Sequence, residues 1–282
     1  MLRIAAITTS RNDAFFAAKW LDYYGEQFGK ENLYMFIDGK DQLVPENAGA
    51  SHVKMLDHVV QNVVAGDKAR IARVNELAES LFEEYDIVIG TDVDEFLAID
   101  PMSEFTLMEY LGQMKHLRLN GYSVSALGID VGQKVGIEPD IALDRPVLEQ
   151  RSCGVLCSRY TKPIVMLQPA KWGSGYHRIE GHGFHIDQNL YLFHLGYCDL
   201  ALLKARKNDQ SRIEAGWERH LGKRAKTIEY CTRSEARDGD RCFEGARKLQ
   251  TAFRPIYALN KPGSIGSRTV IRIPDRFKRL GI

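Results

Sequence analysis

Residues 87–97 read IVIGTDVDEFL, an apolar run that passes directly into acidic residues. The run is short and β-prone, and is typical of a strand buried on both faces of a sheet. Strand and helix patterns come before it. In a sheet of parallel strands the loops that bind ligands lie at the carboxyl ends. We therefore expect Asp92, Asp94 and Glu95 to lie at a ligand-binding edge.

The first hundred residues alternate between strand and helix patterns. Strands are expected at residues 4–8, 33–37 and 87–90, and helices at residues 17–28 and about 67–85. Gly29 stands where a helix C-cap would lie, and Asp67 is the expected N-cap of the second helix. This alternation predicts an α/β fold, Rossmann-like, with a mostly parallel sheet flanked by helices.

The rest of the chain is less regular. Helices are expected at about 103–117, 200–221 and 235–252, and strands at 122–127, 164–167 and 190–193, with a loop-rich stretch at 128–169. Loops of that length usually carry binding surface. We expect a catalytic domain at residues 1–207, with residues 208–282 forming a helical and basic extension packed on it.

Composition limits the function classes. The 282 residues include 38 Lys and Arg against 37 Asp and Glu, so no global field favours nucleic acid, and we expect none to bind. No apolar run reaches the roughly 20 residues of a membrane helix, and the first residues are unlike a secretory signal. These features predict a cytoplasmic protein with reduced cysteines. The basic tail from Arg254 onward is a candidate for peripheral contact with a membrane.

Asp92 and Asp94 are the strongest candidates for chemistry. Two carboxylates one residue apart at a strand end can hold Mg²⁺ or Mn²⁺, both of which prefer oxygen ligands. Such an ion clamps a diphosphate and stabilises the charge that develops when a sugar–phosphate bond breaks. The structural alternative is that Asp94 or Asp100 caps a helix.

Three blocks of the chain resemble glycosyltransferase family 92 and related branches of the family 2 superfamily. The segment at 91–97 is similar to their Asp-x-Asp-Glu-Phe signature. The opening block at 11–29 is similar to an Asn-Glu … Trp-x-x-Tyr-His … Gly pattern, although Tyr24 replaces the usual His. The closing block comprises Lys162-Pro163-Ile164-Val165, His177, Phe193-His194-Leu195-Gly196-Tyr197 and Lys204. The resemblance covers roughly residues 3–207.

The resemblance implies a GT-A fold and a transfer of the hexosyltransferase kind. The donor would be a nucleoside-diphosphate sugar, with a UDP-sugar favoured, and the acceptor a hydroxyl of a glycan or another molecule. Asp92 and Asp94 would serve the metal and the donor diphosphate, and Asp94 would thereby act in catalysis. His194 would be the third protein ligand, and its imidazole suits Mn²⁺ better than Mg²⁺.

The first two strand ends are the expected nucleotide site. Thr8 and Arg11 are candidates for contacts with base, ribose or phosphate, and Asp38 for accepting from ribose or uracil. Lys162 and His177 are candidates for neutralising the diphosphate, although a Lys at a strand start is usually exposed.

An inverting transfer needs a carboxylate base near the acceptor hydroxyl. The candidates are Asp130, Glu149, Glu180 and Asp187. Glu180 and Asp187 are preferred because they flank a glycine-rich segment that holds four of the eight histidines. Trp172 and Tyr176, at the start of this segment, form either a platform for a sugar ring or ordinary core packing.

Two rival interpretations remain open. One is a phosphatase of the haloacid dehalogenase type, whose nucleophile also lies in a strand-terminal Asp-x-Asp. There the motif normally ends the first strand, whereas two strands precede it here, and Glu95 stands where Thr or Val is usual. The other is a non-catalytic module that binds carbohydrate or a partner on the same fold.

Overall fold

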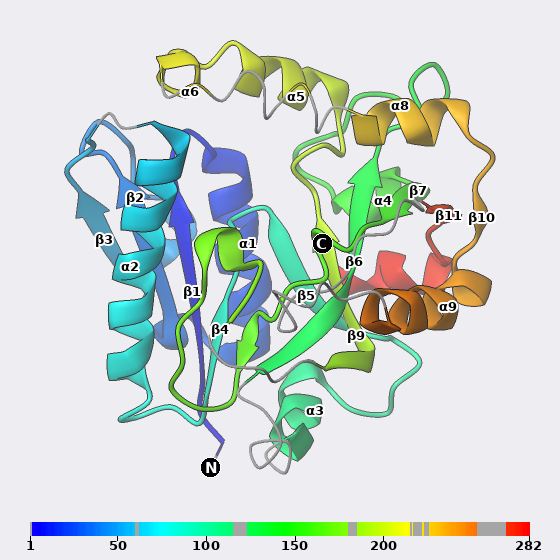
Figure 1. Ribbon diagram of the computed structural model, residues 1–282. Coiled ribbons are helices and arrows are strands. Elements are labelled where there is room, and N and C mark those ends of the chain that lie inside the picture. Colours follow the sequence, from blue (N-terminus) through cyan, green and yellow to red (C-terminus); the bar gives the residue numbers. More distant parts are fainter. Residues whose placement is uncertain are drawn as a thin grey trace.

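The computed structural model describes residues 2–59, 62–114, 123–179, 185–214, 216, 222, 226–252 and 269–282. Within these residues the strands form one sheet in the order β10-β11-β7-β6-β8-β4-β1-β2-β3, to which β5 and β9 are added beside β6. Helices cover the sheet (Figure 1). The predicted α/β class, with parallel strands flanked by helices, is confirmed.

The first half of the sheet is parallel. Its strands are β1 (Ile4–Ser10), β2 (Leu33–Asp38), β3 (His52–Leu56) and β4 (Ile87–Gly90), and β1 pairs in parallel with both β2 and β4. Helix α1 (Ala14–Phe28) joins β1 to β2, and α2 (Val63–Leu81) joins β3 to β4. The two crossovers run in opposite directions along the sheet, so right-handed connections place α1 and α2 on opposite faces (Figure 1).

The second half of the sheet is mixed. Its strands are β5 (Glu95–Ile99), β6 (Ser123–Gly132), β7 (Cys153–Leu156), β8 (Val165–Met166), β9 (Ile186–His194), β10 (Arg237–Asp238) and β11 (Thr269–Arg272). The long strand β6 pairs in parallel with β9 and antiparallel with β7 and β8. Strand β9 pairs antiparallel with β5. Because β11 pairs with β7, the C-terminal part of the chain contributes a strand to the sheet as well as helices.

The remaining helices surround this half. They are α3 (Leu107–Gln113), α4 (Val147–Gln150), α5 (Leu200–Lys207), α6 (Gln210–Glu214), α8 (Lys226–Arg233) and α9 (Gly239–Ala252). Helices α5 and α6 run across the edge of the sheet at which the parallel strands end (Figure 1). Asn12, which follows β1, donates hydrogen bonds to Asp209 and Ser211, so the α5–α6 segment lies directly over the end of β1.

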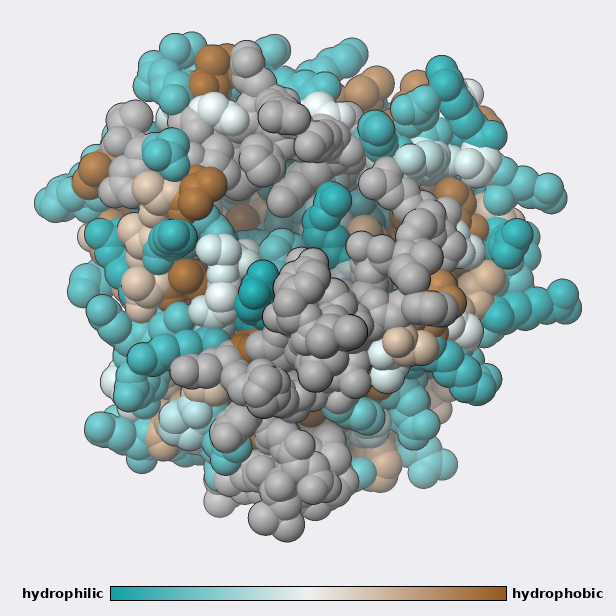
Figure 2. Space-filling view, viewed as in Figure 1, coloured by the Kyte–Doolittle hydropathy of each residue, from teal (hydrophilic) through white to brown (hydrophobic). Residues whose placement is uncertain are grey.

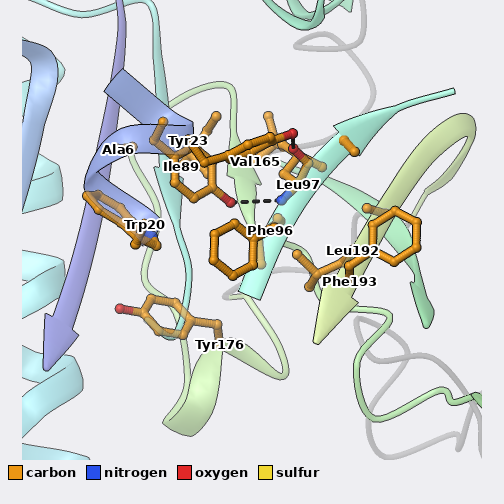
Figure 3. Packing of buried hydrophobic residues seen from close by; sticks show 14 of the residues in the cluster. Ala6, Trp20, Tyr23, Ile89, Phe96, Leu97, Val165, Tyr176, Leu192 and Phe193 are labelled. Carbon is orange, nitrogen blue, oxygen red and sulfur yellow. Dashed lines mark hydrogen bonds between the residues drawn. The ribbon is translucent and has the colours of Figure 1, made fainter. Parts of the chain in front are cut away.

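The core lies where α1 meets the strands of both halves. Figure 3 shows Phe96 of β5 between the rings of α1 and Phe193 of β9. The polar tips of the α1 rings are satisfied. Trp20 Nε1 donates to the Thr91 hydroxyl at 2.9 Å, and the Tyr23 hydroxyl donates to the Leu97 carbonyl at 2.6 Å. Aromatic residues on α1 therefore hold the β4–β5 turn against the sheet.

Several element boundaries differ from the sequence predictions. Helix α2 begins at Val63 and is capped by Asn62, whose side chain accepts from Ala65 N, so Asp67 is not its cap. The helix expected at 200–221 ends at Lys207 and is followed by the short α6. Strands β3, β5 and β7 and helix α8 were not predicted. Strand β3 is only half-buried at the sheet edge, which weakens its apolar pattern.

Hydrophilic side chains cover much of the described part of one face of the molecule (Figure 2). On the face shown in Figure 2, hydrophobic side chains lie scattered among hydrophilic ones. None of the described helices combines the length and the apolar character needed to span a bilayer. Three cations of the described part of the basic tail are paired within the chain: Arg272 with Asp238, Arg276 with Asp100 and Asp240, and Lys278 with Asp275.

Candidate functional site at the ends of β1 and β4

The acidic motif forms the tight connection between β4 and β5. Glu95 N donates to the Asp92 carbonyl at 3.0 Å, and Asp92 N donates to the Glu95 carboxylate at 3.3 Å. Asp94 lies between them, and its carbonyl accepts from Leu195 N at 2.9 Å. The motif is therefore held both by its own backbone and by the end of β9. Neither Asp94 nor Asp100 caps a described α-helix, so the alternative that the motif contains only a helix cap is excluded for the described helices.

Strand register places three ionisable side chains in one row. Glu95 of β5 is opposite His194 of β9, and His194 is opposite Asp130 of β6. Directly paired residues point to the same face of a sheet. His194 Nδ1 lies 2.7 Å from Asp130 Oδ1, and Thr227 donates to Asp130 Oδ2 at 2.5 Å. The Tyr160 ring stacks on the imidazole at 3.8 Å, so the orientation of His194 is fixed on several sides.

Asp92 is bound by two cations. Its Oδ1 accepts from Arg70 at 2.7 Å and its Oδ2 accepts from Lys162 at 2.7 Å. Lys162 also lies 2.6 Å from Glu95 Oε1. Burial alone would raise the pKa of Asp92, but the charges of Lys162 and Arg70 outweigh it and hold the pKa far below its usual range. Asp92 is therefore a carboxylate at neutral pH.

The fully buried Glu95 differs from Asp92. Burial raises the pKa of Glu95; Lys162 opposes this rise and Asp92 adds to it, and the resulting pKa is about 7. Burial would lower the pKa of Lys162, but Asp92 and Glu95 raise it, so the amine stays charged. Lys162 is 1% exposed and its nitrogen lies between two carboxylates. The Lys162 amine therefore holds the Asp92 carboxylate in position.

Asp94 is bound by a cation from α5. Arg206 Nη1 donates to Asp94 Oδ2 at 2.8 Å, and Arg206 Nη2 lies 2.9 Å from Asp13 Oδ1. Arg212 adds a second ion pair to Asp13 at 2.5 Å. Burial raises the pKa of Asp94, but the charges of Arg206 and His194 together lower the pKa by more than burial raises it, so the net shift is downward. Arg206 thus ties α5 to the loops that follow β1 and β4.

Two of the three expected metal ligands face each other. His194 Nε2 lies 3.7 Å from Asp94 Oδ2, and two atoms that each bind one ion at about 2.1 Å can be that far apart. The Asp130 contact to the other ring nitrogen is the arrangement usual for a metal-binding His. Both aspartates also contact cations, since the two oxygens of Asp92 accept from Arg70 and Lys162 and Asp94 Oδ2 accepts from Arg206. Among the described residues no group of three or more His, Cys, Asp or Glu side chains is placed to hold a metal.

The residues expected to bind the nucleotide lie at the strand ends, but Thr9 takes the place that was expected for Thr8. Thr8 is buried and donates to the Thr91 carbonyl at 3.0 Å, so it joins β1 to β4 and does not face a ligand. The alternation of the strand turns Thr9 to the opposite face, where its hydroxyl accepts from Arg70 at 3.1 Å. Arg11 donates to the Asp38 carbonyl at 2.5 Å.

The Asp38 side chain has a partner that the sequence did not suggest. Asp38 Oδ2 lies 3.0 Å from His58 Nδ1, a residue that follows β3. Both side chains are partly exposed at the carboxyl end of the parallel strands. This half of the edge therefore offers acceptors and donors that suit a base or ribose.

Other expected site residues are not brought to this cluster. Asp187 lies seven residues before His194 on β9, roughly 23 Å away at about 3.3 Å per residue, and binds the Tyr110 hydroxyl. Asp187 is therefore too far from His194 to act as a base at this cluster. Glu149 is at the surface beside Arg145. His177 Nδ1 lies 2.9 Å from the Arg159 carbonyl. Glu180 lies outside the described residues.

The aromatic pair is core packing. Trp172 and Tyr176 are buried and pack edge to face at 5.4 Å over Gly90. A Cβ at Gly90 would lie 2.7 Å from Tyr176 and 2.8 Å from Trp172. The rings close over the end of β4, and neither presents an open face to a sugar.

Sequence reasoning missed the cations from the helices. Arg70 and Arg206 reach the motif from α2 and α5, and no local pattern marks either one, because a helical arginine is usually exposed. Asp130 was one of four base candidates, ranked behind Glu180 and Asp187, and the structure makes it the partner of His194. The only signal for these roles would have been the pairing of elements in space.

The fold and the site together define an α/β protein with a buried charged cluster at the carboxyl ends of its parallel strands. No family model matches the chain, and neither does any curated protein sequence. Among solved structures it is similar to the mannose-1-phosphate geranyltransferase from Thermus thermophilus, at 10% identity and a TM-score of 0.30, over 98% of this chain and 77% of that one. It is also similar to the apo WbbM bifunctional glycosyltransferase, at 14% identity and a TM-score of 0.23, over 44% and 26% of the two chains. Sequence identity and TM-score are low in both comparisons, so an inference about function has to rest on the chemistry of the site.

Proposed function

We propose that this chain is a GT-A type glycosyltransferase that moves a sugar from a nucleoside-diphosphate donor, with UDP-sugars favoured, to an acceptor hydroxyl. The observation that carries the proposal is where the charged cluster lies. Strand β1 pairs with β2 on one side and with β4 on the other, so the order of strands reverses between β1 and β4. Ligands of open α/β sheets bind at such a point, and Asp92 and Asp94 follow β4 there.

In this proposal Asp94 and His194 hold a divalent cation, with Mn²⁺ favoured. That ion would neutralise the departing diphosphate when bound. Asp130 holds the proton on His194 Nδ1, which leaves Nε2 free to face Asp94. Arg206 keeps Asp94 ionised and directed toward His194. Lys162 fixes the rotamer of Asp92, and Glu95 holds the Lys162 amine in place.

The nucleotide lies over the ends of β1 and β2 in this proposal. Asp38 and His58 provide the polar contacts for base or ribose, and Arg11 fixes the end of β2, where Asp38 lies. The acceptor would approach from the side of the second half of the sheet. The base that deprotonates the acceptor is not assigned.

A thermal-shift screen of ADP, CDP, GDP and UDP, with and without Mn²⁺, tests the proposal. Stabilisation grows with the ratio of ligand to its dissociation constant, about 2.7 kcal/mol at a hundredfold ratio. We expect one diphosphate to raise the melting temperature, and Mn²⁺ to increase the shift. No response to any diphosphate would contradict the proposed function.

Donor hydrolysis then separates the rival classes. A glycosyltransferase releases sugar slowly from its nucleotide-sugar in the presence of Mn²⁺. A binding module releases none, and a phosphatase cleaves simple phosphate esters that carry no nucleotide. Asp94→Asn should abolish release while the folded domain persists, and Asp187→Asn, at the far end of β9, is the matched control that should retain it.

A further inference from the structure

We propose that Arg70 binds the diphosphate of the donor, which deepens the proposed function and rests on it. Arg70 belongs to α2 and lies at the β1/β4 reversal. Its Nη1 donates to Thr9 near the end of β1, at 3.1 Å, and to Asp92 after β4, at 2.7 Å. Arg206 also joins the segments that follow these two strands, through Asp13 and Asp94, but it reaches them from α5.

Exposure distinguishes Arg70 from the other cations on the motif. Lys162 is 1% exposed and Arg206 is 9% exposed, so each is enclosed by its carboxylates. Arg70 is 27% exposed and Asp92 is 29% exposed. A ligand that arrives at the motif therefore meets Arg70 before it meets the other two cations.

The surroundings of Arg70 hold its guanidinium in place. Nη2 donates to Asp67 Oδ1 at 2.6 Å, one turn earlier on α2, and the guanidinium lies 5.6 Å from the centre of the buried Tyr176 ring. A planar guanidinium has five N–H donors in a rigid fork that matches two phosphate oxygens. Because Asp67 is itself partly exposed, a diphosphate can take its place at Nη2 without uncovering a buried carboxylate.

The chemical class of the ligand follows from the charges. Arg70 is bound by Asp92 and Asp67, so a single weak anion gains little by displacing either one. A diphosphate offers more charge and several oxygens, and it can contact Arg70 while its other end reaches the Asp94 and His194 pair. Arg70 is then a residue that distinguishes nucleoside diphosphates from monophosphates.

The test compares diphosphate with monophosphate binding by calorimetry. The wild-type chain, Arg70→Gln, Arg70→Lys and the control Arg73→Gln are titrated, with Mn²⁺ present, with ADP, CDP, GDP and UDP and with the matching monophosphates. Arg73 is exposed on the same helix. We expect Arg70→Gln to weaken the preferred diphosphate about 10- to 100-fold, the range for a hydrogen-bonded charged group, and its monophosphate less than about 3-fold. Arg70→Lys should fall between, and Arg73→Gln should match the wild type.

The outcomes are distinguishable. If the wild type binds a diphosphate and Arg70→Gln keeps the same preference over the monophosphate, the assignment of Arg70 is wrong while the proposed function stands. An equal loss of both nucleotides also contradicts it, because Arg70 would then support the shape of the site. If the wild type binds none of the eight nucleotides, the proposed function itself fails.

Discussion

Lys162 Nζ lies 2.7 Å from Asp92 Oδ2 and joins two segments that are 70 residues apart in the sequence. The amine comes from the chain just before β8, whereas Asp92 follows β4, and β4 pairs with β8. The same nitrogen contacts Glu95, so one buried cation contacts two carboxylates of the acidic motif. This lysine is part of the interior of the protein as well as of its site.

Lys162→Met should destabilise the fold. Removing one partner of a buried ion cluster leaves uncompensated charge, which costs about 3 to 5 kcal/mol. Urea denaturation at neutral pH measures the change. Lys204→Met on α5 is the control, because Lys204 is exposed and such changes stay within about 0.5 kcal/mol. A loss below about 1 kcal/mol for Lys162→Met would show that Asp92 and Glu95 do not need the amine.

Asp130→Asn should weaken metal binding if His194 is a ligand. The amide cannot hold the Nδ1 proton as a carboxylate does, and the loss of such a partner costs roughly 10- to 100-fold in metal affinity. Calorimetric titration with Mn²⁺ measures it, with a melting curve to verify folding. Unchanged Mn²⁺ affinity in a folded Asp130→Asn chain would remove His194 from the ligand set.

Gly90→Ala should destabilise the end of β4. The new methyl group would lie 2.7 Å from Tyr176 and 2.8 Å from Trp172, both of them buried rings. Overpacking of this kind typically costs about 1 to 3 kcal/mol. Gly245→Ala is an informative control, since Gly245 lies inside α9 with open space around it. There the same change should stabilise the helix by up to about 1 kcal/mol. Equal stability of both variants would contradict the packing described here.

Asp100→Asn should lower stability at neutral pH and not in acid. Arg276 donates to both oxygens of Asp100, at 2.7 and 2.9 Å. Burial raises the pKa of Asp100, but the hydrogen bonds from Arg276 and Met102 lower it more, so the net shift is downward. A lowered pKa in the folded state means that the stabilisation is present above the unfolded value and disappears as pH falls through the folded one.

The pH series makes that prediction specific. The variant should lose about 1 to 2 kcal/mol near pH 7, the scale of a hydrogen bond to a charged group. The difference from the wild type should shrink once the pH falls below about 4, the ordinary pKa of the carboxyl in the unfolded chain, and continue to shrink toward the lower pKa of the folded state. Urea denaturation at several pH values gives both curves. A difference that grows toward acid would reverse the sign and contradict the lowered pKa.

The sequence by itself determined where β1, β2, β4 and the acidic motif lie, although it did not indicate β3 or β5. The apolar run at 87–90 needs a fully buried strand, and the acidic residues come directly after it. The same local logic placed β1, β2 and α1, including the helix end at Gly29. It was less successful for α2, where Asn62 rather than Asp67 is the cap, because both residue types satisfy the same helix-end donors.

Only the tertiary structure decided which charges meet at the motif. Arg70, Lys162 and Arg206 reach Asp92 and Asp94 across separations of 22, 70 and 112 residues. The row of Glu95, His194 and Asp130 exists because three strands pair in one register. Local propensity depends on neighbours within a few residues, whereas these contacts depend on strand register and helix packing. The acidic motif could therefore be predicted from the sequence, but the partners that set its charge could not.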